Sequence, residues 1–305
     1  MALQLFDCPV PSDRPLSVAL GAFDGVHCGH IPVLQAALDA AQADGCPAVF
    51  SFANLIGTVK KTKQLISTRQ YRTILMQMGF ERLYLPNFQT MCDLSPREFV
   101  TEILHQKMHV KHVACGFNYR FGCGGSGGSA ELRALCEPLG IRVTVVPPLM
   151  AQDRPISSTR IRQLVADGAM EQAAQLLGRP YAIDFAVVHG RALGRTLGLP
   201  TINQPFPENF VLPRFGVYAS AVQLDGRLYH AVTNVGVKPT VGASGPLAET
   251  YIVGYSGDLY DQHVTVQLRA FLRPEEKFPS IEALKQQIER DCTVAQQILH
   301  AKNME

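Results

Sequence analysis

The chain has 305 residues, of which 47% are hydrophobic and 18% charged, and this composition excludes an intrinsically disordered protein. Its length suffices for two domains that each bury a core. The formal net charge is only +2 and no run of lysines and arginines concentrates it, which argues against nucleic-acid binding but leaves small anionic ligands possible.

The first fifteen residues mix acidic residues with prolines, at Asp7, Pro9, Pro11 and Asp13. They form neither a basic start followed by an apolar signal segment nor a membrane span, so we expect a cytoplasmic protein that binds no membrane. The eight cysteines are scattered, without a CxxC pair that would hold a metal. Reduced thiols are therefore expected, as in other cytoplasmic proteins.

The first half alternates short apolar runs with helical patterns, which is typical of a parallel sheet covered by crossover helices. Strands are expected at 16–21, 47–52, 82–85, 111–115 and 141–146, and a helix at 29–44. A further helix should begin near Ser95, because Ser95 can cap it, Pro96 suits the first helical position and Glu98 completes a capping box. The pattern predicts a doubly wound α/β fold.

Residues 121–129 contain five glycines and two serines. This segment is either a mobile loop or one that brings backbone N–H groups close to a ligand, and the pattern leaves both readings open. Two short helical patterns then run from 156 to 177, and Gly178-Arg179-Pro180 ends them. We place the domain boundary between 178 and 179.

Beyond Tyr181 the pattern changes to alternating strands. Asp225-Gly226 is a hairpin signal between strands at 217–224 and 228–235. A strand at 249–255 is expected to pair with one at 264–271 across Gly257-Asp258. These features predict a mainly antiparallel β-barrel, partly covered by a terminal helix at 280–299.

The first informative motif is Gly-Ala-Phe-Asp-Gly-Val-His-Cys-Gly-His at residues 21–30, where the first strand turns into the first helix. Ligands bind at this junction in open α/β sheets. Two imidazoles three residues apart at a helix start, His27 and His30, lie on one face beside free N–H groups and suit a phosphate chain. A metal site needs a third ligand, which the motif lacks. By itself the histidine pair is equally compatible with a structural role.

The second motif is Ile-Ser-Ser-Thr-Arg-Ile-Arg at residues 156–162, again at a helix start. Consecutive hydroxyls followed by arginines supply the short donors and planar guanidinium groups that phosphate oxygens need. Taken alone, an ordinary serine N-cap with solvated arginines explains the segment at least as well.

Together the two motifs resemble the signature GxFDGxHxGH with a distal ISSTxxR of the bacterial bifunctional riboflavin kinase/FMN adenylyltransferases, or FAD synthetases. The resemblance covers nearly the whole chain. It implies a Rossmann-like FMN adenylyltransferase (nucleotidyltransferase) domain at residues 1–178 and a riboflavin kinase domain at residues 179–305. The nucleotide-binding residues that it implies in the first domain are Gly21, Phe23, Asp24, His27, Gly29, His30, Ser157, Ser158, Thr159 and Arg162. Residues 116–122 resemble the family's flavin-side loop, which assigns Asn118 and Arg120 to flavin binding.

A glycine-rich segment begins at Gly190 and continues through Gly194 and Gly198. Such glycines let backbone N–H groups approach phosphates, although a simple tight turn accounts for them equally well. The Pro-Thr-x-Asn that follows is similar to the riboflavin kinase signature. The resemblance implies that Thr201 and Asn203 hold Mg²⁺ and the phosphates of ATP.

Glu249 matches the glutamate that the kinase family uses as its catalytic base, although a carboxylate at a strand start is usually only a solvated edge residue. Residues 257–260, Gly-Asp-Leu-Tyr, match the turn that follows it. Asn234, Gly236, Pro239 and Thr240 resemble the family's NxGxxPT segment, which shapes the kinase site.

The resemblance implies an enzyme that phosphorylates riboflavin to FMN and adenylylates FMN to FAD, with ATP as co-substrate and Mg²⁺ as cofactor. Two departures affect the N-terminal half. The family usually carries Pro-His-Pro after the second strand, whereas residues 51–57 are Ser-Phe-Ala-Asn-Leu-Ile-Gly. Ala22 also stands where the family commonly has asparagine.

These departures leave open a riboflavin kinase whose N-terminal domain is weakly active or only binds its ligands. A further alternative, from another class of protein, is a flavin-sensing regulator that catalyses nothing. The presence of Glu249 argues against it because a pure binder needs no base.

Overall fold

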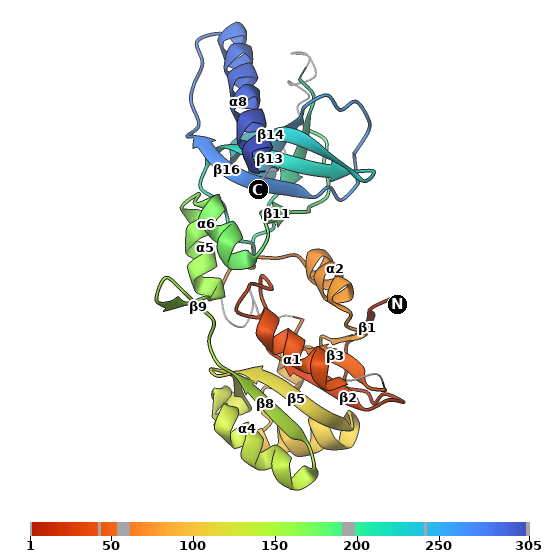
Figure 1. Cartoon of the computed structure of the whole chain (residues 1–305). Coiled ribbons are helices and arrows are strands. Elements are labelled where there is room, and N and C mark those ends of the chain that lie inside the picture. The colour runs from red at the N-terminus through yellow and green to blue at the C-terminus, as the bar shows by residue number, and fades with distance from the viewer. Residues whose placement is uncertain (1, 42–43, 54–61, 191–198, 241–242, 303–305) are drawn as a thin grey trace. The chain divides into compact units, whose positions relative to one another are not determined.

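The computed structural model describes residues 2–41, 44–53, 62–190, 199–240 and 243–302 (Figure 1). Its contacts divide the chain into two compact units. The first unit comprises Met1–Gln64 and Thr68–Ser158, and the second comprises Leu65–Ser67 and Thr159–Glu305. The second unit therefore includes most of the helical segment that precedes residue 178. The domain boundary between 178 and 179 stays a prediction.

The first unit is built on a parallel sheet with the strand order β1-β4-β3-β2-β5-β8. Its strands are β1 (Gln4–Phe6), β2 (Leu16–Leu20), β3 (Cys46–Phe50), β4 (Arg82–Tyr84), β5 (Val110–Gly116) and β8 (Arg142–Val146). Its principal helices are α1 (Ile31–Ala41), α2 (Thr68–Met78) and α4 (Ser129–Cys136). Every residue of β2 and β3 is buried, as expected for central strands that helices cover on both faces. The doubly wound α/β prediction is confirmed.

The strand order reverses direction at β2. Leu20 pairs with Phe50 of β3 on one side and with Cys115 of β5 on the other. Open α/β sheets bind ligands at such a switch point, beyond the carboxyl ends of the strands. The loops that follow β2 and β5 therefore border the expected binding crevice.

The predicted capping box at Ser95 is present. Its hydroxyl accepts a hydrogen bond from the Glu98 backbone N–H at 3.2 Å, and the Glu98 carboxylate accepts one from the Ser95 N–H at 2.7 Å. Only the first turn, α3 (Pro96–Glu98), is α-helical, and it continues as a π-helix at Phe99–Lys107. The start of this helix is confirmed, while its π-helical continuation was not predicted.

The glycine-rich segment after β5 forms a small hairpin. Strand β6 (Arg120–Phe121) pairs with β7 (Gly127–Gly128) around a short 3₁₀ turn at Cys123–Gly125. A separate two-stranded sheet of β9 (Met150–Ala151) and β10 (Arg154–Pro155) follows β8. Gly122 has a φ of 74°, a conformation that glycine adopts at little cost.

The second unit begins with two helices and continues as a curled antiparallel sheet of order β11-β16-β13-β14-β15-β12. The helices are α5 (Ser158–Ala166) and α6 (Met170–Leu177), and α6 ends at Gly178, which is left-handed with a φ of 74°. The strands are β11 (Tyr181–Ile183), β12 (Thr201–Pro205), β13 (Gly216–Leu224), β14 (Arg227–Thr240), β15 (Ala243–Ile252) and β16 (Val266–Arg273). This antiparallel, curled sheet confirms the predicted class of the C-terminal half.

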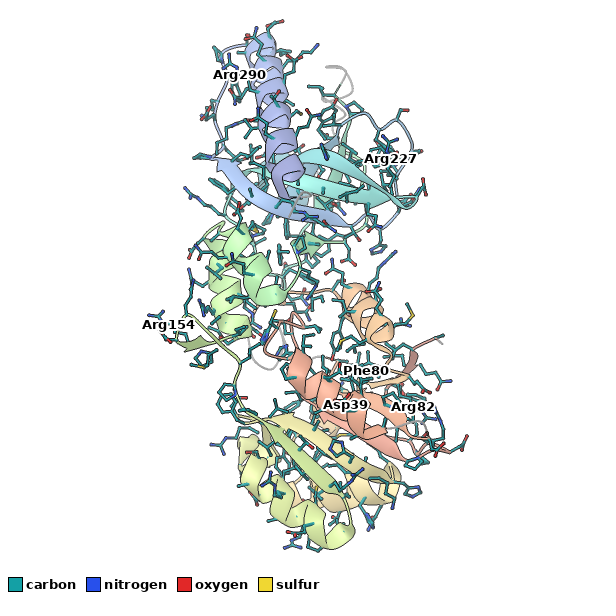
Figure 2. All side chains as sticks on the ribbon, in the orientation of Figure 1. Asp39, Phe80, Arg82, Arg154, Arg227 and Arg290 are labelled. Carbon is teal, nitrogen blue, oxygen red and sulfur yellow. The ribbon has the colours of Figure 1, made fainter. Side chains whose placement is uncertain are left out.

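The hairpin predicted at Asp225-Gly226 is confirmed. Leu224 pairs with Arg227, and the two loop residues have φ angles of 48° and 76°, as a type I′ turn requires. Arg227, labelled in Figure 2, begins β14 at this turn. Its guanidinium lies 4.9 Å from the ring centroid of Tyr229.

The predicted pairing of 249–255 with 264–271 is wrong. Strand β15 pairs with β14 and β12, whereas β16 pairs with β13 and β11. Both edges of β15 are thus occupied, because the long strand β14 pairs with one edge from Ala231 to Thr240 and β12 pairs with the other. Residues 253–265 cross over to β16, and the Gly257-Asp258 turn lies within that connection.

The predicted terminal helix is α8 (Ile281–Lys302), which packs over β13 and β14 (Figure 1). Ala295 of α8 joins a buried cluster with Val217, Ala219, Val232 and Ala270 of the sheet. Within the described ranges, no helix has both the length and the apolar character needed to cross a bilayer.

A buried polar chain connects three strands of the first unit. The Nδ1 atom of His112 lies 3.0 Å from the Ser17 hydroxyl, and its Nε2 lies 2.9 Å from the Thr144 hydroxyl. Ser17 donates its hydroxyl proton to the Ala37 carbonyl at 2.6 Å, so it must accept from Nδ1–H of a neutral imidazole. Burial, followed by the charge of Arg142, lowers the pKa of His112 to about 4.

We predict that acid destabilises the first unit through His112. An unfolded histidine gains its proton near pH 6.5 and the folded one only near about 4, so stability falls as the pH is lowered between these values. The free energy of unfolding that is lost over this whole pH range is about 3 kcal/mol, because each pKa unit corresponds to 1.36 kcal/mol. Urea unfolding at several pH values should show this decline, and His112→Asn should be less stable at pH 7 but less sensitive to pH. An equally steep decline in the variant would contradict the assignment.

Candidate functional sites

The loop after β2 has an unusual backbone. Phe23 and Val26 have φ angles of 47° and 40°, and both are buried. Positive φ is rare for such residues and costs about 1–3 kcal/mol each, so it persists only where the surrounding contacts impose it. The Phe23 ring packs edge-on against His30, with ring centroids 5.3 Å apart. Strain of this kind is characteristic of binding loops.

The two imidazoles of this loop lie on one face, as predicted. The rings of His27 and His30 stack with centroids 3.5 Å apart and an angle of 18° between their planes. They lie just before α1, and the His30 N–H donates to the His27 carbonyl at 2.7 Å. The unpaired N–H groups expected here are not found, because those of Ile31, Val33 and Leu34 donate to the carbonyls of His27 and His30. The N-terminus of an eleven-residue helix still places the positive end of its dipole at this point, which suits a phosphate.

The two N-terminal motifs meet although they are far apart in the sequence. The Ser158 hydroxyl donates to the Asp24 carbonyl oxygen at 2.9 Å. A Cβ atom at Gly29 would lie 3.1 Å from the Ile156 carbonyl oxygen, so the glycine permits this close approach. Ser157, like Ser158, is half-buried. The structure thus joins the strained loop directly to the serine-rich segment.

A buried carboxylate and a buried phenol belong to the same region. Asp24 is 6% exposed, and Tyr71 on α2 is 7% exposed. Burial raises the pKa of Tyr71 above its ordinary value, and the nearby charge of Asp24 raises it further. Sequence reasoning missed Tyr71, since a tyrosine in an amphipathic helix looks like an ordinary core residue.

Other predicted residues of this site are described but not brought to it by a printed contact. Thr159 and Arg162 lie on α5 and belong to the second unit, so their place at the nucleotide site stays a prediction. Asn118 is exposed in the loop after β5, the strand beside β2 at the switch point, and Arg120 is exposed at the start of β6. The Ser51 hydroxyl contacts the Ala22 carbonyl at 3.5 Å, but residues 54–61, which include Asn54, lie outside the described part of the chain.

The second site lies on the antiparallel sheet, where three residues form one cross-strand row. Glu249 on β15 pairs directly with Asn203 on β12 and with Asn234 on β14. Directly paired residues project from the same face of a sheet, about 4.8 Å apart from strand to strand. Thr201 precedes Asn203 by two residues and so shares this face. We call Asn203, Glu249 and Asn234 the catalytic row.

Gly190 lies directly against the catalytic row. A Cβ atom there would be 2.5 Å from the Asn203 amide nitrogen, so no larger residue fits without displacing Asn203. The Val188 N–H donates to the Asn203 carbonyl at 2.8 Å, which holds this segment alongside β12. Gly194 and Gly198 lie outside the described residues.

Sequence reasoning missed His189. Its ring stacks on that of Tyr260, with centroids 3.8 Å apart. Tyr260 belongs to the predicted Gly-Asp-Leu-Tyr turn, and its N–H donates to the Asp258 carboxylate at 3.0 Å. The stack connects the start of the glycine-rich segment with the connection between β15 and β16. The position of His189 directly before Gly190 was the available signal.

Comparisons with known proteins match both halves of the chain. Residues 177–299 match the riboflavin kinase family model, and residues 10–160 match the FAD synthetase family model. The chain is 34% identical over 282 residues to the bifunctional riboflavin kinase/FMN adenylyltransferase of Listeria monocytogenes, covering 90% of this chain and 89% of that protein. It is 33% identical over 287 residues to the protein of the same name from Escherichia coli, covering 92% and 91%.

A solved structure resembles the whole chain. It is described as a macrolide-efflux protein from Streptococcus pneumoniae, and it is 29% identical. The TM-score is 0.84, with 97% of this chain and 99% of that chain covered.

Proposed function

Since the chain belongs to the family of bifunctional riboflavin kinase/FMN adenylyltransferases, we propose that residues 179–305 form the riboflavin kinase domain and residues 1–178 the FMN adenylyltransferase domain. The protein is an ATP-dependent phosphotransferase and nucleotidyltransferase that makes FMN from riboflavin and FAD from FMN. A flavin-sensing regulator without catalysis, or a kinase with a binding-only N-terminal domain, is not favoured.

The catalytic row is the observation that carries the kinase assignment. Glu249 takes the proton of the riboflavin 5′-hydroxyl, whose oxygen attacks the γ-phosphorus of ATP, and ADP leaves. Asn203 lies directly opposite Glu249, so one side of the base faces the residues assigned to ATP. Gly190 lets the backbone come close to the phosphates, and Gly194 and Gly198 continue this segment.

The residues around Asn203 fit a magnesium ion. Thr201 and Asn203 offer a hydroxyl and an amide oxygen on one face of β12, and Gly190 packs closest to the amide nitrogen of Asn203 rather than to its oxygen. Mg²⁺ prefers oxygen ligands and is usually held by few protein groups together with substrate phosphates. Thr201 and Asn203 would hold the ion, which would supply positive charge against the ATP phosphates.

For adenylyl transfer we propose a site at the β2–β5 switch point. An FMN phosphate oxygen attacks the α-phosphorus of ATP and pyrophosphate leaves, which requires no protein nucleophile. His27, His30, Ser158 and Arg162 act by positioning and by electrostatic stabilisation. Gly21, Phe23, Asp24, Gly29, Ser157 and Thr159 complete the nucleotide contacts, while Asn118 and Arg120 bind the flavin side. The contact of Ser158 with Asp24 supports this assignment.

We also propose a cytoplasmic location. All eight cysteines are free, which suits a reducing compartment, and ATP is the co-substrate of both reactions.

We predict that Glu249→Gln abolishes most kinase turnover. The substitution keeps the shape of the side chain but removes the base, and positioned proton transfer is typically worth about 10²- to 10⁴-fold in rate. FMN formation from riboflavin, measured by chromatography, should fall by this factor while the KM for ATP stays nearly unchanged. The exposed Glu276→Gln is the matched control and should behave as wild type. Near-normal turnover of Glu249→Gln would show that another group is the base.

We predict that FMN accumulates ahead of FAD when riboflavin, ATP and Mg²⁺ are supplied. The histidine of the usual Pro-His-Pro is absent, and a hydrogen bond to a charged group is worth about 1.5–3 kcal/mol. Its loss slows adenylyl transfer by about one to two orders of magnitude. Asn54 offers at most a neutral amide in that stretch.

The matching variant is His30→Ala, which should remove the residual FAD and leave FMN formation intact. FAD formed as fast as FMN would show that the departure from Pro-His-Pro is harmless. FAD made by His30→Ala would overturn the assignment of the N-terminal site.

A further inference from the structure

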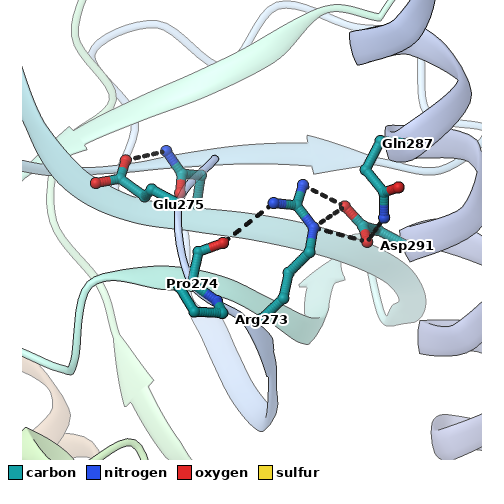
Figure 3. A network of polar contacts seen from close by, with 6 residues as sticks. Arg273, Pro274, Glu275, Gln287 and Asp291 are labelled. Atoms are coloured by element: carbon teal, nitrogen blue, oxygen red, sulfur yellow. Dashed lines mark hydrogen bonds and ion pairs between the residues drawn. The ribbon is translucent and has the colours of Figure 1, made fainter. Parts of the chain in front are cut away.

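The loop after β16 carries a second carboxylate to the kinase site. Glu275 accepts a hydrogen bond through Oε1 from the Asn234 amide nitrogen at 3.0 Å (Figure 3). A Cβ atom at Gly236 would lie only 2.2 Å from this same Oε1, so the carboxylate lies directly over the bare strand. Gly236 and Asn234 are two residues apart on β14 and share a face. Glu275 is therefore on the face that bears Glu249.

The orientation of Asn234 follows from the chemistry of its partner. An ionised carboxylate only accepts hydrogen bonds, so the amide NH₂ of Asn234 must face Glu275. Asn234 is thereby a fixed anchor for one carboxylate oxygen. The other oxygen, Oε2, makes no hydrogen bond or ion pair within the described ranges, and the Glu275 side chain is exposed. One oxygen is held by the protein and the other is available to a ligand.

The strand that leads to Glu275 is fixed to helix α8. Arg273 donates to both carboxylate oxygens of Asp291, at 3.1 and 2.8 Å, and Gln287 donates to Asp291 at 3.0 Å (Figure 3). Arg273 also donates to the Pro274 carbonyl at 3.1 Å, immediately before Glu275. Asp291 is 5% exposed, so this ion pair is largely shielded from solvent. These contacts hold the Pro274–Glu275 segment in place.

The order of groups along the row indicates what Glu275 contacts. Asn203 lies on the ATP side of Glu249, and Asn234 lies on the opposite side. In phosphoryl transfer the attacking and leaving oxygens are roughly in line, so the alcohol must approach from the side away from the phosphates. A carboxylate beside ATP would repel its charge, whereas on the alcohol side it meets neutral hydroxyl groups.

We propose that Glu275 binds the secondary hydroxyl groups of the ribityl chain of riboflavin, with Asn234 as the residue that positions its carboxylate. This inference rests on the proposed kinase function and adds a residue that selects a polyol substrate. The free Oε2 accepts from a hydroxyl near the 5′-hydroxyl, which keeps the latter beside Glu249. Gly236 is required because any side chain there displaces the carboxylate.

The test compares riboflavin with a flavin that carries an unbranched 5-hydroxypentyl chain. This analogue keeps the terminal hydroxyl but lacks the secondary ones. Glu275→Ala should raise the KM for riboflavin about 5- to 10-fold, the low end for a charged hydrogen bond because the site is exposed. The KM for ATP and the KM for the analogue should change less than about 2-fold, since their contacts do not involve the lost group.

Three further variants separate the proposed role from a structural one. Gly236→Ala should reproduce the riboflavin defect without altering the carboxylate itself. Glu275→Gln, which still accepts from Asn234, should restore most of the affinity. Glu276→Ala removes the neighbouring exposed carboxylate and should match wild type.

Equilibrium binding followed by flavin fluorescence provides a readout that needs no turnover. Weaker riboflavin binding to Glu275→Ala, with unchanged binding of the analogue, supports the inference. Equal weakening for both flavins, an unchanged riboflavin affinity or a raised KM for ATP would overturn it. A wild-type protein that binds riboflavin but forms no FMN would contradict the proposed function and leave the binding comparison valid.

Discussion

The pairing of β15 between β12 and β14 is the constraint on which the proposed kinase site depends. It aligns Asn203, Glu249 and Asn234, although these residues come from three separate stretches of sequence. The inner face of the same strands fixes this alignment, because Ala248, Thr250 and Ile252 are buried and Thr250 exchanges a hydrogen bond with Thr233 at 3.0 Å. A slip of one residue would bury Glu249 and expose the apolar side, so core packing determines which face carries the carboxylate.

The N-terminal site depends on a different constraint, the reversal of strand order at β2. The loops after β2 and β5 leave the sheet side by side, and the contact of Ser158 with Asp24 brings the distal motif to the first loop. Strained residues, stacked imidazoles and a helix N-terminus gather at this one edge. In the proposed account each sheet supports one reaction by its own means, with a strand row for phosphoryl transfer and a helix N-terminus for adenylyl transfer.

Local signals predicted local structure well. The capping box at Ser95, the type I′ turn at Asp225-Gly226 and the left-handed end of α6 at Gly178 follow from side chains within a few residues. The partner of β15 could not be derived in this way, because a turn signal at Gly257-Asp258 does not reveal which distant strand edge is free. The candidate residues came from family resemblance, whereas Tyr71 and Glu275 emerged only from contacts, since their residue types are ordinary in a helix or loop. His189 also emerged from a contact, although its position directly before Gly190 was a signal in the sequence.

The central claim, that each sheet carries one complete reaction, can be tested by mixing two variants that are each defective in one site. Glu249→Gln and His30→Ala are incubated separately and together with riboflavin, ATP and Mg²⁺, and FAD is measured by chromatography. The account predicts that neither variant alone forms appreciable FAD, whereas the mixture does, because FMN released by one protein is adenylylated by the other. A mixture that forms no more FAD than the separate variants, while supplied FMN is still adenylylated by Glu249→Gln, would contradict two independent sites connected by free FMN.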